Sequence, residues 1–193
     1  ARGAGTGLAG GAVPLDGAVV VATTKMNRVI AVDDVNRFAW VEPGVLNLDL
    51  TRQMSQKGLH FAPDPSSQIA CSIGGNIAEN SGGVHCLKYG LTVHNVMRVR
   101  AISIEGEVLE FGSEALDSPG LDVLAALIGS EGMLAVVTEV SVRLIPKPQL
   151  ARVVMASFDD VIKAGEAVAM IIAEGIIPAG LEMMDQKTAE AVE

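Results

Sequence analysis

The chain has 193 residues and a formal net charge of −9, from 14 basic and 23 acidic side chains. Nucleic-acid binding needs a basic surface, so this charge argues against it. Hydrophobic residues make up 49% of the chain, but the longest apolar helical stretch, Ala167–Ala173, is far shorter than the roughly 20 residues that span a bilayer. The length allows one domain, or one domain and part of another, and we expect no transmembrane segment.

The first elements are a glycine-rich loop and the strands that follow it. The loop opens Arg2-Gly3-Ala4-Gly5-Thr6-Gly7 and continues through Gly10-Gly11. Because glycine lacks Cβ and adopts positive φ, such a loop can turn several backbone N–H groups inward and bind a phosphate. The dinucleotide fingerprint Gly-x-Gly-x-x-Gly is present, but it requires a helix directly after the loop. The valine-rich stretch Ala18–Ala22 predicts a strand instead, which favours a phosphate loop leading into strands over a nicotinamide site; a flexible connector is the alternative.

A helix and a second segment of small residues come next. We expect strands at Arg28–Asp33 and Phe38–Val41, then a helix at Leu48–Lys57 with Asn47 as its N-cap and Gly58 at its end. The second segment runs from Pro63 to Gly83 and reads PDPSSQIACSIGGNIAENSGG. Two such segments can clasp one extended ligand from two sides, and a diphosphate is the natural candidate. Arg2 would add a charge-assisted hydrogen bond to it, unless it is an ordinary solvated arginine.

The remaining elements complete an α+β layout. We expect a hairpin of Met97–Ile104 and Glu107–Phe111, a short helix at Leu121–Ile128 and a long strand at Val136–Ile145. Pro146-Lys147-Pro148 marks a domain boundary. Beyond it, Val153–Phe158, Asp160–Glu174 and Ile176–Met184 predict a βαβ unit whose helix has one apolar face. The two cysteines lack metal-ligand spacing, and we expect both to be reduced.

In this order and at this spacing, the motifs resemble the PCMH-type (vanillyl-alcohol-oxidase-type) FAD flavoproteins. Within that family the chain is most similar to the flavin subunits of bacterial glycolate oxidases, with D-lactate and D-2-hydroxyglutarate dehydrogenases as relatives. The similarity covers essentially the whole chain. Arg2–Pro14 resembles the pyrophosphate loop, and Asp64–Gly83, continued by Val84–Gly90, resembles the second FAD loop. Gly129–Leu134 resembles the closing motif of the FAD domain, and Gly180–Asp185 resembles a segment early in the cap domain.

The resemblance implies a fold, a cofactor and a set of site residues. The fold is α+β, with a PCMH-type FAD-binding domain over residues 1–147 that lacks its N-terminal part, and the truncated beginning of a substrate (cap) domain over residues 148–193. The implied FAD-binding residues are Arg2, Gly3, Ala4, Gly5, Thr6, Gly7, Pro63, Asp64, Ser72, Gly75, Asn76, Gly82, Gly83, Glu131, Gly132 and Val137. Covalently flavinylated relatives have a histidine near position 6. Threonine cannot form that bond, so the resemblance implies non-covalent FAD.

The resemblance also implies a reaction. It is the FAD-dependent oxidation of a small 2-hydroxy acid, glycolate to glyoxylate or D-lactate to pyruvate, with a hydride passed to flavin N5 and electrons passed to a partner subunit. The implied partners include an iron–sulfur subunit, and the implied location is the cytoplasm, with membrane association only through partners. The catalytic residues are expected in the cap region beyond this chain, and no metal ligands are expected within it.

Two other classes of protein compete with this interpretation. One is a nucleotide-binding module or isolated fragment without redox activity of its own. The other is an ATP-using enzyme, but no Gly-Lys-Ser/Thr follows either glycine loop, so the P-loop lysine is absent.

Three residues have more than one interpretation. His85 approaches the flavin ring or is a hydrogen-bonded structural residue. Glu131 contacts the adenosine or caps a turn. Ala135 stands where the family usually has glycine; because Ala135-Val136-Val137 continues a strand pattern, we expect an ordinary strand conformation there and not positive φ.

Overall fold

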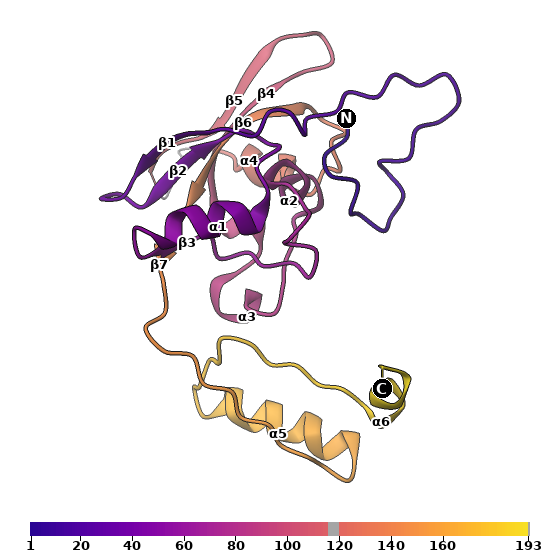
Figure 1. The fold of residues 1–193 in the computed structure, drawn as a ribbon, viewed down its shortest axis with the longest axis vertical. Helices are drawn as coiled ribbons and strands as arrows, with labels where there is room; N and C mark the ends of the chain where they lie inside the picture. The colour runs from indigo at the N-terminus through magenta and orange to yellow at the C-terminus, as the bar shows by residue number, and fades with distance from the viewer. Residues whose placement is uncertain (116–119, 193) are drawn as a thin grey trace.

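The computed structural model describes residues 1–115 and 120–192, and its body (residues 1–147) is built on an antiparallel sheet (Figure 1). The sheet has five strands in the order β1-β2-β6-β4-β5, and a separate pair joins β3 to β7. The strands are β1 Val29–Asp33, β2 Phe38–Val41, β3 Leu59–His60, β4 Val96–Ile102, β5 Val108–Gly112, β6 Val136–Arg143 and β7 Ile145–Pro146. The helices are α1 Asn47–Ser55, α2 Ile73–Glu79, α3 Cys86–Tyr89, the 3₁₀ turn η1 Thr92–His94, α4 Val123–Leu127, α5 Val161–Ala173 and α6 Gln186–Val192.

One face of the sheet forms the core. Successive side chains of a strand point to opposite faces, and accordingly Ala39 and Val41 of β2 are fully buried while Phe38 and Trp40 are partly exposed. Leu50 of α1 packs into the same cluster, as do Ile73 and Ile77 of α2. Helices and sheet therefore share one hydrophobic core, and that core fixes the position of the second glycine-rich segment.

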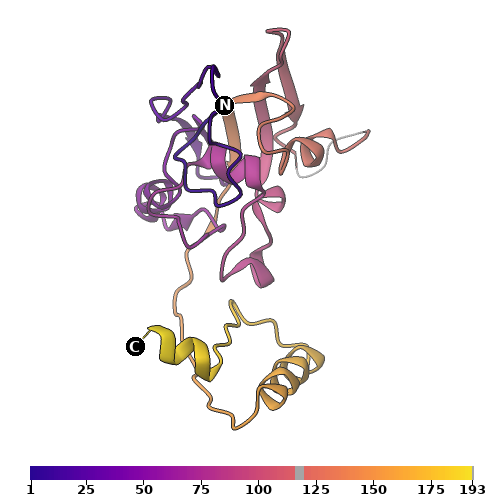
Figure 2. The same cartoon turned by 90° about the vertical axis from the view of Figure 1, so that its right-hand side faces the viewer.

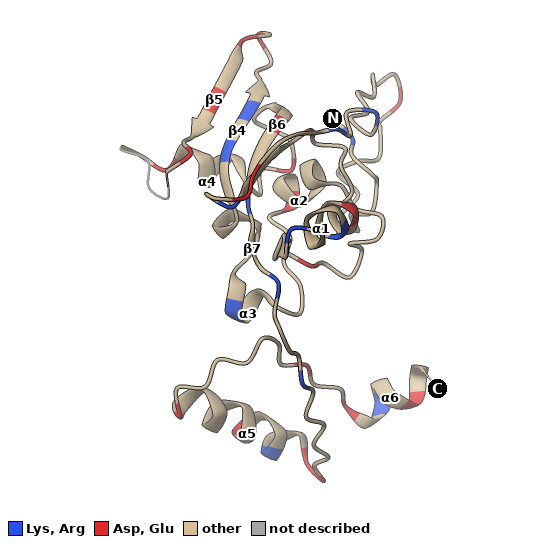
Figure 3. Cartoon of the chain, turned by 60° about the vertical axis from the view of Figure 1, so that its left-hand side comes forward, with Lys and Arg blue, Asp and Glu red and all other residues tan. Residues whose placement is uncertain are grey.

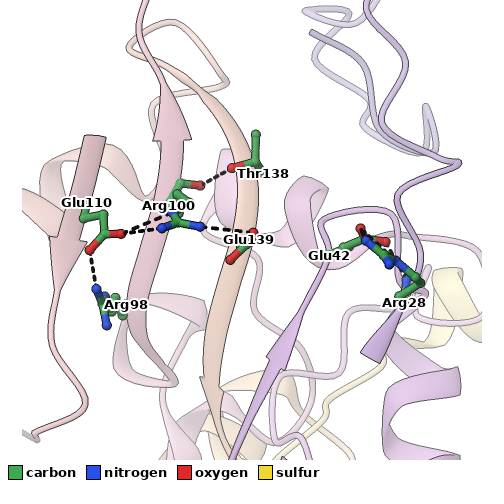
Figure 4. Close-up of polar contacts among 7 residues, drawn as sticks. All are labelled: Arg28, Glu42, Arg98, Arg100, Glu110, Thr138 and Glu139. Carbon is green, nitrogen blue, oxygen red and sulfur yellow. Dashed lines mark hydrogen bonds and ion pairs between the residues drawn. The ribbon is translucent and has the colours of Figure 1, made fainter. Parts of the chain in front are cut away.

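The opposite face of the sheet carries a ladder of charges across three strands (Figures 3 and 4). Arg100 of β4 binds Glu110 of β5 at 3.1 Å and Glu139 of β6 at 3.4 Å, and Arg98 also pairs with Glu110. The Arg98 guanidinium lies 5.5 Å from the centre of the Trp40 ring. An antiparallel sheet with one solvated face commonly has this pattern, so we assign the ladder no ligand.

A further ion pair lies at the edge of the sheet, where Glu42 is nearly buried. Its carboxylate accepts hydrogen bonds from the Arg28 backbone nitrogen at 2.8 Å, from Nε at 3.1 Å and from Nη2 at 2.7 Å. The hydrogen bonds from the Arg28 side chain, and then that from its backbone, hold the pKa of Glu42 below its usual value of 4.5. Because the folded state favours the charged carboxylate, this contact stabilises the fold above pH 4.5 and is lost as the pH falls below it.

Glu42→Gln is therefore expected to lower the free energy of unfolding at neutral pH and to flatten its fall in acid. Urea unfolding of both proteins between about pH 3 and pH 7 measures this slope. Parallel curves would show that the Glu42 carboxylate has the same pKa in the folded and unfolded states.

The elements expected around the sheet are largely confirmed. The hairpin pairs Arg98 with Gly112 through to Ile102 with Val108, and Gly106 in its turn has a φ of +83°. Strands β1, β2 and β6 and helices α1 and α4 lie within a few residues of their expected bounds. The N-cap expectation was wrong, because α1 begins at Asn47 itself and the Asn47 amide donates to the Pro63 carbonyl at 2.9 Å.

Three expected strands are wrong. Ala18–Ala22 forms a single bridge, from Ala22 to Arg2, because no strand among the described residues lies beside the valines to pair with them. Val153–Phe158 and Ile176–Met184 likewise have no strand assigned, so helix α5 is present without the expected βαβ unit. A strand needs a neighbour to satisfy its backbone N–H and C=O groups, and β-branched composition alone does not supply one.

The C-terminal segment (residues 148–192) extends away from the body and carries α5 and α6 (Figures 1 and 2). No residue of α5 is buried within the described part of the chain, although its sequence VIKAGEAVAMIIA is mostly apolar. Among the described residues, every helix is too short or too polar to cross a membrane.

Candidate cofactor site

The N-terminal glycine-rich loop is tied to the body at its first residues. The Arg2 backbone nitrogen donates to the Val21 carbonyl at 2.9 Å, and the Thr23 nitrogen donates to the Arg2 carbonyl at 3.0 Å. Gly5 has a φ of +73°. It lies against the Arg2 guanidinium, because a Cβ on Gly5 would be 3.1 Å from Arg2 Nη2. Through residues 1–46, all of which are described, no helix follows the loop, as expected.

The second glycine-rich segment contains helix α2, which sequence reasoning missed. Ser72 caps this helix by accepting a hydrogen bond from the Gly75 nitrogen at 3.2 Å. Glycines permit close packing on both sides of it. A Cβ on Gly74 would lie 2.6 Å from Pro43 Cβ, and one on Gly3 would lie 2.8 Å from Ser72 Oγ. The first loop thus lies directly against the start of α2.

An open cavity lies between the two glycine-rich segments and α4. Its apolar wall comes from α2, α4 and the start of β6, and Arg2 and Gly3 of the first loop also line it. The lining residues are Ala1, Arg2, Gly3, Thr23, Pro43, Gly74, Gly75, Ile77, Ala78, Leu127, Ser130, Glu131, Gly132, Ala135, Val136 and Val137. An apolar wall with a few polar groups at the mouth is typical of a cofactor site.

Some of the predicted site residues line the cavity, and the others lie in three places outside its lining. Arg2, Gly3, Gly75, Glu131, Gly132 and Val137 line the cavity. Ala4, Gly5, Thr6 and Gly7 continue the first loop, and a Cβ on Gly7 would lie 3.5 Å from the Glu79 carboxylate. Ser72, the N-cap of α2, and Asn76 on α2 do not line the cavity, although Gly75 and Ile77 on either side of Asn76 do. Pro63, Asp64, Gly82 and Gly83 do not line the cavity; Asp64, Gly82 and Gly83 contact one another or the segment around α3.

The closing motif brings Glu131 to the cavity in an unusual conformation. Glu131 has a φ of +55°, and its backbone nitrogen donates to the Ala78 carbonyl of α2 at 2.8 Å. Its carboxylate reaches the first loop, since Oε2 would lie 3.3 Å from a Cβ on Gly11. Ala135 is buried and has no positive φ, as expected, but it lies just before β6, which begins at Val136.

Thr23 and Pro43 line the cavity and were missed from the sequence. Thr23 contacts the first loop through the Arg2 carbonyl, and the Pro43 carbonyl accepts a hydrogen bond from the Gly74 nitrogen at 2.8 Å. Both lie in turns that carry no motif. Only the Pro43-Gly44 pair, which is typical of a tight turn, offered a signal.

Asn76 provides a test of whether the site suits a ligand such as FAD. Its side chain is fully buried, and neither its amide nitrogen nor its amide oxygen has a partner among the described residues. Its neighbours Gly75 and Ile77 both line the cavity. A buried amide without partners is costly, and a polar ligand beside it would supply them. With the Arg2 cation and an apolar wall lining the cavity, these residues fit a dinucleotide such as FAD.

Fold and site together define a cofactor-binding α+β domain, and comparison with known families makes the class specific. Residues 1–112 match the model of the FAD binding domain family, and residues 147–193 match that of FAD linked oxidases, C-terminal domain. The chain therefore belongs to the FAD binding domain family. The expected PCMH-type fold and FAD as the cofactor are confirmed. The division at residue 147 and the individual site residues stay predictions.

Among individual relatives, glycolate oxidase subunit GlcD of Escherichia coli (strain K12) is 58% identical over 192 residues, which are 100% of this chain and 38% of that protein. GlcD of Bacillus subtilis (strain 168) is 42% identical over 193 residues, 100% of this chain and 41% of that protein. The D-lactate dehydrogenase of Archaeoglobus fulgidus is 37% identical over 190 residues, 98% of this chain and 42% of that protein. The chain thus spans about two fifths of the length of these relatives.

A solved structure of alkyldihydroxyacetonephosphate synthase has the same fold. It superposes with a TM-score of 0.78 at 24% identity, covering 93% of this chain and 33% of that one. At this identity the likeness concerns the fold alone.

Proposed function

We propose that this chain is the FAD-binding part of an enzyme that oxidises a small 2-hydroxy acid to the 2-keto acid. The observation that supports it most is the 58% identity to a glycolate oxidase subunit over the whole chain. D-lactate dehydrogenases among the relatives support the same substrate class. Glycolate is our first choice of substrate, and D-lactate is the alternative.

The chain's own part in this reaction is to bind and orient the cofactor. When bound, FAD supplies the hydride acceptor, at N5 of its flavin ring. We assign the Arg2 guanidinium and the N–H groups of the first loop to the diphosphate, because a guanidinium forms short charge-assisted hydrogen bonds to phosphate oxygens. The apolar wall at Ile77, Ala135 and Val137 suits an aromatic ring. The buried Asn76 amide does not itself line the cavity, and we assign it to polar atoms of the cofactor because it has no partner among the described residues and its neighbours Gly75 and Ile77 form part of the wall.

The finer points of the proposal concern attachment and partners. FAD is held without a covalent bond, because threonine at position 6 cannot form one. Electrons then pass to another subunit, which we propose to be an iron–sulfur protein. The word subunit in the relatives' names supports a complex. The enzyme is proposed to be cytoplasmic and to meet a membrane only through such partners. The catalytic base, and any metal, are proposed to lie outside this chain.

Equilibrium binding tests the cofactor assignment at Arg2. The chain and the whole protein are titrated with FAD, FMN, NAD and ATP. Selective FAD binding is expected, and Arg2→Gln should weaken it about 10- to 100-fold, as the loss of a charged hydrogen bond worth about 1.5–3 kcal/mol implies. Arg2→Lys keeps the charge and should lose less. Selective ATP binding, or no nucleotide binding by either protein, would contradict the proposal.

Substrate oxidation is tested separately, with the whole protein, its partners and an artificial dye as electron acceptor. Glycolate-dependent dye reduction is expected, with D-lactate as the competing substrate. Dye reduction that is independent of every 2-hydroxy acid would contradict the proposed reaction but not the FAD assignment.

A further inference from the structure

Asp64 and His85 connect the second glycine-rich segment to the residues before helix α3. The Asp64 carboxylate accepts two hydrogen bonds from this one histidine: Oδ2 lies 2.5 Å from Nδ1, and Oδ1 lies 3.3 Å from the backbone nitrogen. The Asp64 side chain is 18% exposed and that of His85 is 45% exposed. Gly83 packs so closely that a Cβ there would lie 2.1 Å from the Asp64 carbonyl oxygen. These contacts fix both the backbone and the ring of His85.

Tyr89 extends this contact to the strand pair β3–β7. Its ring lies 6.5 Å from that of His85 and 6.2 Å, edge-on, from that of His60 on β3. His60 pairs with Ile145 in the register of β3 and β7, and burial lowers the pKa of the His60 ring, which favours its neutral form. The chain leaves the body at β7. His60, Asp64, His85 and Tyr89, the hinge cluster, thus reach the point from which the C-terminal segment departs.

The C-terminal segment returns to the body beside the same cluster. Gly180 lies against Val84, the residue before His85: a Cβ on Gly180 would lie 2.7 Å from Val84 Cγ1 and 2.9 Å from the Val84 carbonyl oxygen. Figures 1 and 2 both show this return of the chain beneath α3. We call this contact between Gly180 and Val84 the seat of the C-terminal segment. The hinge cluster therefore connects the seat to β7, where the segment leaves the body.

We propose that the hinge cluster is a set of positioning residues that fixes how the C-terminal domain sits on the FAD-binding body. Asp64 and His85 hold the seat at Val84, and Tyr89 and His60 tie that seat to β7. The proposal rests on the proposed function, because substrate sites commonly lie between domains and a substrate held by one domain must meet the flavin held by the other. A misplacement of about 1 Å can cost about 100-fold in rate.

This role differs from the one expected for Asp64 from the sequence. The contact of Asp64 with FAD stays a prediction; in the structure each of its carboxylate oxygens accepts a hydrogen bond from His85, and Asp64 does not line the cavity. It acts through His85 on the seat of the other domain.

The test uses the whole protein with FAD bound and compares three variants. Asp64→Asn weakens the seat from the body side. Gly180→Ala disturbs it from the C-terminal side and leaves every residue of the FAD-binding body unchanged in sequence. Gly165→Ala is the matched control, because a Cβ there meets nothing within 4 Å. FAD affinity, kcat and KM are measured for each variant, and domain placement is followed by the distance between spin labels at Arg52→Cys and Glu166→Cys in a Cys86→Ser background.

We expect Asp64→Asn and Gly180→Ala both to shift the label distance and to lower kcat at least about tenfold, with FAD affinity within about threefold of the unmodified protein. Adding Val84→Ala to Gly180→Ala removes the contact with Cγ1 and should restore part of the rate. Gly165→Ala should leave every quantity unchanged.

Two outcomes would overturn the proposal. Loss of FAD affinity in Asp64→Asn with an unchanged label distance would make Asp64 a cofactor ligand. Gly180→Ala behaving like Gly165→Ala would show that the seat positions nothing. If the unmodified protein oxidises no 2-hydroxy acid, the proposed function fails, and the label distances still decide the positioning role.

Discussion

Gly83→Ala is expected to lower the free energy of unfolding by about 1–3 kcal/mol and to weaken FAD binding with it. The added Cβ would lie 2.1 Å from the Asp64 carbonyl oxygen and 2.4 Å from Oδ1, closer than any real Cβ contact. The carbonyl oxygen belongs to the backbone and cannot rotate away, so either the backbone at Asp64 or the backbone at Gly83 must move. The movement would pull apart the two ends of the second glycine-rich segment, whose middle part forms α2 and the cavity wall.

Gly82→Ala is the matched control one residue earlier. Its Cβ would also meet an atom at short range, 2.5 Å, but that atom is Cδ2 of Leu91, a terminal methyl group that can turn aside. Urea unfolding and FAD titration of both variants separate the two effects. Equal losses in the two variants would show that the segment tolerates no added Cβ and that the Asp64 backbone has no special part in it.

The sequence predicted best the elements whose signals are local. The hairpin of β4 and β5 has alternating residues on both sides of a glycine turn, and this pattern needs no information from the rest of the chain. The valine-rich stretch Ala18–Ala22 has the same composition but pairs only at Ala22, because its pairing depends on a strand that the described residues do not place beside it. Strand composition is a local property, whereas strand pairing is not.

Helix α2 shows the opposite case, in which packing overrides local preference. Its Gly74-Gly75 pair disfavours a helix by about 1 kcal/mol per glycine relative to alanine. Ile73 and Ile77, four residues apart, are both essentially fully buried, and this burial holds the helix. The spacing of the two isoleucines is typical of a helix, but the two glycines between them argue against one, so the sequence did not predict α2.

For the candidate site, the sequence indicated which segments matter but not which residues share a cavity. Arg2, Gly75 and Glu131 come from three distant segments and line one cavity, as the motifs suggested. Asp64 and Gly83 belong to the same motif as Gly75, yet they lie with His85 beside the C-terminal segment. A motif fixes order along the chain, and only the fold decides which of its residues face the ligand.

Asn76 is where stability and cofactor binding are expected to change in opposite directions. Its amide is fully buried without a partner among the described residues, and an unsatisfied buried polar group costs about 1–3 kcal/mol. Asn76→Leu keeps the approximate shape and removes that cost. The FAD-free protein should therefore become more stable by about this amount, while FAD binding weakens about tenfold or more because the amide no longer meets the cofactor.

Asn47→Leu is the control for a buried asparagine whose amide nitrogen has a partner, although its Oδ1, like the amide of Asn76, has none among the described residues. Its Nδ2 donates to the Pro63 carbonyl at 2.9 Å, so the substitution leaves that carbonyl without a donor and should lower stability. Unfolding in urea without FAD, followed by FAD titration, is measured for both variants. If Asn76→Leu lowers the stability of the FAD-free protein, as Asn47→Leu should, the amide is already satisfied, for instance by a buried water, and is not reserved for the cofactor. If stability rises and affinity falls, the unpartnered Asn76 amide destabilises the FAD-free protein, and FAD binding removes that cost by supplying its hydrogen-bond partners.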